Sequence, residues 1–160
     1  MKGAILEKGE KYYTDLSKVF SAINNAQNDY NWLITASECY PQNHEIYDLL
    51  SQEYCWLSGH ELSGIIEIED FQWIWAVLSG FEKDISTEDV LKYPFPYADG
   101  YKGFWKNPIS LQHPLATVEI VPWDSSLTLI ISKQDKIVED FMQAFPLSKD
   151  LSVYNTAFEK

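Results

Sequence analysis

The sequence contains no arginine, and its twelve lysines are opposed by 24 aspartates and glutamates, which gives a formal net charge of −12. Arginine is the side chain that most often binds phosphate through two hydrogen bonds and that reads guanine edges. The phosphates of nucleic acids and anionic lipids repel a strongly acidic chain. We therefore expect a protein that binds neither nucleic acid nor a membrane surface.

Other features are also missing. No glycine-rich phosphate-binding motif occurs, which argues against phosphoryl transfer. No apolar run approaches the length of a membrane span, because Gln72 and Ser79 interrupt the longest candidates, and the first residues lack the apolar stretch of a signal peptide. Cysteine is scarce, with only Cys39 and Cys55. We predict a cytoplasmic protein whose two thiols are reduced.

Apolar and aromatic side chains are abundant. Of the 160 residues, 46% are hydrophobic and 15% are aromatic, which is typical of a globular protein with a large core. No serine- or glycine-rich linker and no block of charge divides the chain. We therefore predict one globular domain over residues 1–160.

The hydrophobic pattern predicts both helices and strands. Apolar residues at helical spacing predict two amphipathic helices, over about 11–25 and 135–145. Strands are expected at 3–7, 30–37, 54–58, 116–121 and 127–132, the last two forming a hairpin. Gly59 and Gly64 are expected to break the chain. The order of these elements indicates an α+β fold with a mainly antiparallel sheet, a mixed sheet being the alternative, packed against the two helices.

Residues 71–81 form the most apolar run in the chain. Their aromatic and β-branched content favours a central strand that is buried on both faces. A buried helix is the alternative, because periodicity does not separate the two in so short an apolar run.

A short internal repeat suggests a metal site. Cys39 and His44 recur as Cys55 and His60 at the same spacing, and each histidine is followed by a glutamate. Two thiols and two imidazoles are ligands that tetrahedral Zn²⁺ accepts. A zinc-binding or small hydrolytic domain is therefore one hypothesis. The alternative is a purely structural role, in which both cysteines are small buried apolar residues and no metal or other cofactor is present.

Signals for catalysis are weaker. A Cys–His nucleophile pair has no motif around either cysteine, and His113, which precedes an expected strand, is better interpreted as a hydrogen-bonded structural residue. Acidic residues surround the tryptophan-rich run, as in glycoside hydrolases, but no pair of carboxylates stands out. We therefore favour a protein that is not an enzyme.

The segment 93–108 carries six aromatic residues together with three prolines and two glycines. The prolines and glycines exclude a long helix or a central strand here. We expect Phe95, Phe104 and Trp105 to cover one end of the sheet. At the glycine-flanked tip, we predict a binding site formed by four residues, Tyr97, Asp99, Tyr101 and Lys102, because exposed rings with polar groups are frequent at interfaces.

The acidic charge and the aromatic residues together favour one function. We predict a small acidic, non-enzymatic domain that binds a basic protein partner, as immunity and inhibitor proteins do. The identity of the partner and the oligomeric state do not follow from the sequence.

Overall fold

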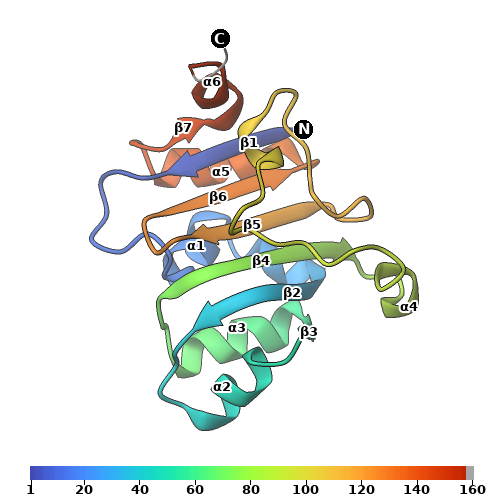
Figure 1. The fold of residues 1–160 in the computed structure, drawn as a ribbon. Coiled ribbons are helices and arrows are strands. Elements are labelled where there is room, and N and C mark those ends of the chain that lie inside the picture. The colour runs from blue at the N-terminus through green and yellow to red at the C-terminus, as the bar shows by residue number, and fades with distance from the viewer. Residues whose placement is uncertain (158–160) are drawn as a thin grey trace.

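A seven-stranded antiparallel sheet runs through the middle of the molecule in the computed structural model, which describes residues 1–157 (Figure 1). The strand order is β3-β2-β4-β5-β6-β1-β7. The strands are β1 (Lys2–Leu6), β2 (Tyr30–Cys39), β3 (Tyr54–Ser58), β4 (Trp73–Glu82), β5 (Val118–Trp123), β6 (Leu127–Ser132) and β7 (Lys149–Asp150). Every pairing between these strands is antiparallel, so the predicted α+β fold is confirmed and the mixed sheet does not occur within residues 1–157.

The apolar run at 71–81 is a strand. It forms β4, which lies between β2 and β5 near the middle of the sheet. Trp73 and Leu78 pack in the core on one face, whereas Val77 packs on the other. Because both faces of β4 are covered, its sequence is apolar at successive positions, which explains why periodicity alone did not identify it.

Three helices cover one face of the sheet: α1 (Leu16–Ala22), α3 (Gly59–Ile68) and α5 (Asp135–Ala144) (Figure 1). The predicted helix at 135–145 is confirmed as α5. The helix expected at about 11–25 is shorter, because Asp15 pairs with Gln72 in a β-bridge before α1 begins. After α1, Asn24 and Asn25 adopt positive φ angles of 54° and 58°, which ends the helix.

Helix α3 spans both glycines that were expected to break the chain. It begins with a capping box, in which the Glu61 backbone N–H donates to the Ser58 hydroxyl and the Ser58 N–H donates to the Glu61 carboxylate. The shorter elements are the helices α2 (His44–Leu50), α4 (Thr87–Val90) and α6 (Leu151–Thr156) and the 3-10 turns Ala26–Asp29 and Gly103–Trp105.

The opposite face of the sheet is covered mainly by the connection between α4 and β5 (Figure 1). Phe104 is fully buried there, while Phe95 and Trp105 are half-buried. The aromatic segment therefore packs as a cover over the sheet, as expected for these three residues. We call residues 93–113 the cover segment.

None of the helices within residues 1–157 has the length and apolar character needed to cross a membrane.

Candidate functional site

The tip of the cover segment carries the four residues predicted to bind a partner. Tyr97, Asp99 and Lys102 are exposed, with 47% of Tyr97 accessible to solvent. Tyr101 is half-buried, because its ring meets those of Tyr97 and Phe104 edge to face, with centroids 5.4 and 4.8 Å apart. Three of the four side chains are therefore exposed, and the Tyr101 ring packs between Tyr97 and the buried Phe104.

A buried carboxylate fastens the cover segment to the sheet. Glu119 on β5 is fully buried and accepts hydrogen bonds from the Ser79 hydroxyl at 2.7 Å and from the backbone N–H groups of Gln112 and His113. Burial raises the pKa of Glu119 to about 7, although the three hydrogen bonds act in the opposite direction. The Gln112 side chain accepts a hydrogen bond from the Tyr97 backbone N–H and donates one to the Tyr97 carbonyl. These bonds connect the tip to the part of the segment that Glu119 holds.

His113 is structural. The Leu115 N–H donates to Nδ1 of His113, so Nε2 carries the proton and donates to the Val90 carbonyl at 2.9 Å. The ring is almost completely buried, and burial lowers its pKa. With both ring nitrogens bonded to the protein, His113 has no free nitrogen to act as a base.

The four residues of the predicted zinc set are not assembled into a site. Cys55 lies opposite Ile34 in the β2–β3 pairing, so Cys39 is five positions further along β2, roughly 15 Å away along the strand. His44 and His60 are exposed in the first turns of α2 and α3. Among the described residues, no group of three or more His, Cys, Asp or Glu side chains is placed to hold a metal ion. The hypothesis that these four residues together bind one zinc ion is therefore wrong.

The two cysteines are also unsuited to nucleophilic catalysis. Both are free and buried, and burial raises the pKa of Cys39 to about 12 and that of Cys55 to about 11. No hydrogen bond joins either thiol to a histidine in the part of the chain that the structure describes. A neutral thiol without a base is a poor nucleophile, and both residues fit the interpretation as small apolar core residues.

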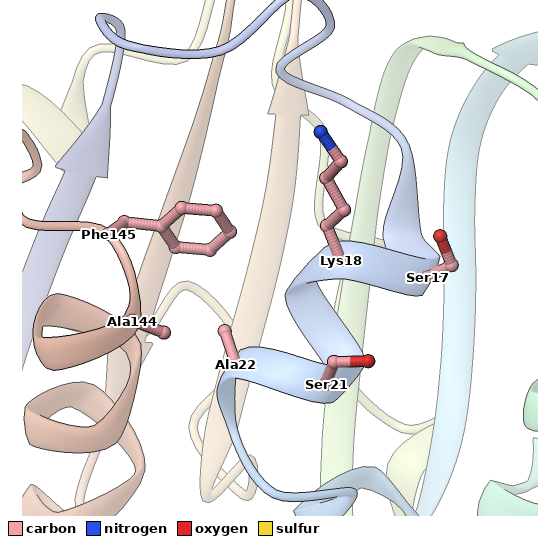
Figure 2. Close-up of a pocket in the computed structure, with 6 residues that line it drawn as sticks. All are labelled: Ser17, Lys18, Ser21, Ala22, Ala144 and Phe145. Atoms are coloured by element: carbon pink, nitrogen blue, oxygen red, sulfur yellow. The ribbon is translucent and has the colours of Figure 1, made fainter.

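An open groove of about 360 Å³ lies between α1 and α5 (Figure 2). Its floor consists of small side chains, with Ala22 facing Ala144, and the Phe145 ring closes one side (Figure 2). The Ser17 hydroxyl bonds the carboxylate of Asp70, and Lys18 points away from the floor and pairs with Glu10 at 3.1 Å. Two of its three polar side chains, Ser17 and Lys18, are therefore paired with carboxylates, and its lining contains no His, Cys, Asp or Glu.

Charge is unevenly distributed between the two ends of the molecule. All twelve lysines lie in residues 1–18 and 83–160, whereas residues 19–82 contain ten acidic residues and no lysine. This lysine-free segment forms β2, α2, β3, α3 and β4, at the β3 end of the sheet (Figure 1). Nine of its acidic side chains are exposed: Asp29, Glu38, Glu45, Asp48, Glu53, Glu61, Glu67, Asp70 and Glu82. The lysine-free segment therefore contributes nine exposed carboxylates and no lysine to the surface at this end of the sheet.

Exposed apolar side chains lie on the same end. Tyr40 is 65% exposed and stacks on Tyr47 of α2, with ring centroids 6.5 Å apart and ring planes 24° apart. Leu49 is exposed nearby on the same helix. We call the following set the α2 surface: Glu38, Tyr40, Glu45, Tyr47, Asp48, Leu49 and Glu53, all exposed. It combines rings and an aliphatic side chain with four carboxylates.

The α2 surface is held in place at both ends of α2. The two carboxylate oxygens of Glu69, which follows α3, accept hydrogen bonds from the backbone N–H groups of Gln42 and Asn43 at 2.8 and 2.9 Å. The Asn43 side chain caps α2 by accepting from the Ile46 N–H. At the other end, the Ser37 hydroxyl donates to the Leu50 carbonyl at 2.6 Å. The surface is thus preorganised by the body of the protein.

None of the residues of the α2 surface is among the four predicted to bind a partner at the tip. The absence of lysine between residues 19 and 82 was the signal that could have indicated it.

The fold defines an α+β protein built on an antiparallel sheet, and no group of three or more His, Cys, Asp or Glu side chains within residues 1–157 is placed to hold a metal ion. A family model described as "Protein of unknown function (DUF2691)" matches residues 1–96, and the chain belongs to this family. The matched part contains the whole lysine-free segment. No curated protein and no solved structure matched the chain.

Proposed function

We propose that this protein is a non-enzymatic binding domain that recognises a basic protein partner through the α2 surface, as an immunity or inhibitor protein does. The observation that carries the proposal is the coincidence of two features at one end of the molecule. The segment with ten acidic residues and no lysine lies there, and so do the stacked and exposed Tyr40 and Tyr47.

The two features support different stages of binding. A surface with one sign of charge attracts an oppositely charged partner and raises the association rate by roughly 10- to 1,000-fold. Tyrosine rings then supply rigid contact area at a small cost in side-chain entropy, which is why they are frequent at interface hot spots. The rest of the chain holds 14 acidic residues and all twelve lysines, so most of the net negative charge comes from the lysine-free segment.

The tip of the cover segment is a second contact in this proposal. Phe95, two residues before Tyr97, packs against Tyr54 of β3 with ring centroids 5.4 Å apart. This contact brings the start of the cover segment to the acidic end of the sheet. Tyr97, Asp99 and Lys102 would extend the interface from there, although the opposite charges of Asp99 and Lys102 make the tip less attractive to a cation than the α2 surface is.

We propose further that the protein acts in the cytoplasm. The support is that Cys39 and Cys55 are both free and buried, which fits a reducing compartment. No cofactor is needed for binding by charge and aromatic contacts.

The proposal is tested by affinity capture. The immobilised protein is incubated with a soluble extract of its source organism, washed at about 50 mM salt and eluted at about 500 mM salt, which screens surface charges beyond a few ångströms. We expect mass spectrometry to identify a basic protein in the eluate that is retained at low salt and released at high salt. Retention that does not depend on salt, or capture of acidic and neutral proteins only, would contradict the proposal.

A further inference from the structure

A small hollow lies beside the stacked tyrosines of the α2 surface. It has a volume of about 230 Å³ and is lined by the end of β2, by Tyr40 and Tyr47, and by the end of α2 with Ser51. Sites for drug-sized ligands are larger, with volumes of roughly 300–1,000 Å³. The hollow is therefore closer in size to a single long side chain than to a drug-sized ligand.

Two serine hydroxyls and one carboxylate in the lining present acceptors to the hollow. The Ser37 hydroxyl donates to the Leu50 carbonyl and the Ser51 hydroxyl donates to the Tyr47 carbonyl, each at 2.6 Å, so both oxygens present only lone pairs to the hollow. The Glu38 carboxylate adds a negative charge. No lysine contributes to this lining, and residues 19–82 contain none. A cation satisfies such a lining, whereas an anion meets no charged donor.

The backbone of β2 is irregular where it forms this lining. The pairing of β2 with β4 shifts register between Thr35 and Glu38 and again between Glu38 and Cys39. Ala36 adopts a φ of 49°, which residues other than glycine rarely adopt. Bulges of this kind turn side chains to new directions and are frequent beside binding sites. Here the irregular segment carries Glu38 next to Tyr40, whose hydroxyl donates to the Glu38 carboxylate at 3.5 Å.

We infer that this hollow binds a cationic side chain, lysine or arginine, of the basic partner; the inference rests on the proposed function and specifies its central contact. The cation lies against the tyrosine rings and pairs with the Glu38 carboxylate. Arginine suits the hollow better than lysine, because its planar guanidinium both stacks on aromatic rings and donates two parallel hydrogen bonds to a carboxylate.

The inference is tested with a small probe in place of the partner. N-acetylarginine amide is titrated into the ¹⁵N-labelled protein, and backbone amide shifts are followed by NMR. We expect saturable shifts confined to residues 37–40 and 47–51, with a dissociation constant on the order of millimolar for one side chain. N-acetylcitrulline amide, which has a similar shape but no charge, is expected to produce no shifts there. Equal shifts with both probes, or arginine-induced shifts elsewhere only, would overturn the inference.

Matched variants sharpen the test. Glu38→Gln removes the charge that faces the hollow and is expected to weaken arginine binding about fivefold or more, as loss of a close ion pair does. Glu53→Gln removes a charge from the same surface outside the hollow and is expected to change binding by less than about twofold, as for an exposed charge. Equal effects of the two variants would show that general charge, and not the hollow, attracts the probe.

The outcome is separable from that of the proposed function. If a captured basic partner binds the double variant Glu38→Gln/Tyr47→Leu as tightly as the original protein, the inference fails while the proposed function stands. If the arginine probe binds in the hollow but no basic protein is captured, the hollow is a cation site and the proposed function fails.

Discussion

Replacing Gly59 with alanine is expected to destabilise the protein by about 3 kcal/mol or more, because the new methyl group has no room. A Cβ at this position would lie 2.0 Å from the carbonyl oxygen of Gln27 and 2.7 Å from the Cα of Asn28. Both are backbone atoms, so no side-chain rotation relieves the clash. The Gln27 carbonyl also accepts the indole N–H of the buried Trp32 at 2.9 Å, and moving it would weaken that hydrogen bond.

The same helix provides the control. A Cβ on Gly64 would meet nothing within 4 Å, so Gly64→Ala is expected to stabilise the protein by roughly 0.5–1 kcal/mol through the higher helix propensity of alanine. Urea unfolding followed by tryptophan fluorescence measures both changes. A loss of less than about 1 kcal/mol for Gly59→Ala would contradict the close packing of α3 against residues 27 and 28.

The second large effect concerns Glu119 and pH. Burial raises the pKa of this carboxyl group from 4.5 to about 7, so the folded state binds the proton more tightly than the unfolded state. The contribution of Glu119 to stability is therefore fully present below about pH 4.5 and is lost as the pH rises through about 7. At about 1.4 kcal/mol for each tenfold change in proton affinity, the loss amounts to roughly 3 kcal/mol.

Glu119→Gln isolates this contribution, because glutamine does not titrate. One carboxylate oxygen of Glu119 accepts hydrogen bonds from Ser79 and His113, and the other accepts one from Gln112. In the variant an amide NH₂ replaces one of these oxygens and cannot accept its hydrogen bonds. We expect it to be less stable by about 1–3 kcal/mol at low pH, and the deficit to shrink or reverse as the pH rises to 8. Urea unfolding of both proteins at pH 5 and pH 8 measures their difference in unfolding free energy. Titratable groups that both proteins share contribute equally and cancel in this difference. Parallel pH dependences would contradict a raised pKa.

Local patterns were sufficient to predict most of the sheet. The hairpin of β5 and β6 and the strand at 54–58 follow from short apolar runs bounded by turn residues, which depend on near neighbours only. Helix α3 was missed for a tertiary reason. Its capping box at Ser58 and Glu61 is a local signal for a helix start, but Gly59 is there because Gln27 packs against it, and that contact does not follow from the sequence.

The site was less predictable than the fold. The composition of the cover segment indicated a tip with exposed rings, but the half-buried position of Tyr101 depends on its contact with Phe104. The repeated Cys–His spacing suggested a metal site, but the β2–β3 register keeps Cys39 and Cys55 apart. Finding the α2 surface required knowing that Tyr40 and Tyr47, which flank the start of α2, stack on each other beside Glu38. These contacts arise only after the chain folds.

The most direct test of the binding function compares two charge reversals against the captured basic partner. Glu45→Lys/Asp48→Lys alters α2, and Asp135→Lys/Glu139→Lys alters α5, which lies against β1 and β6 at the other end of the sheet. Both raise the formal net charge from −12 to −8. We predict that the α2 reversal slows association at low salt about tenfold or more, whereas the α5 reversal slows it by less than about threefold. Equal slowing by both reversals, or none by the α2 reversal, would contradict binding through the α2 surface.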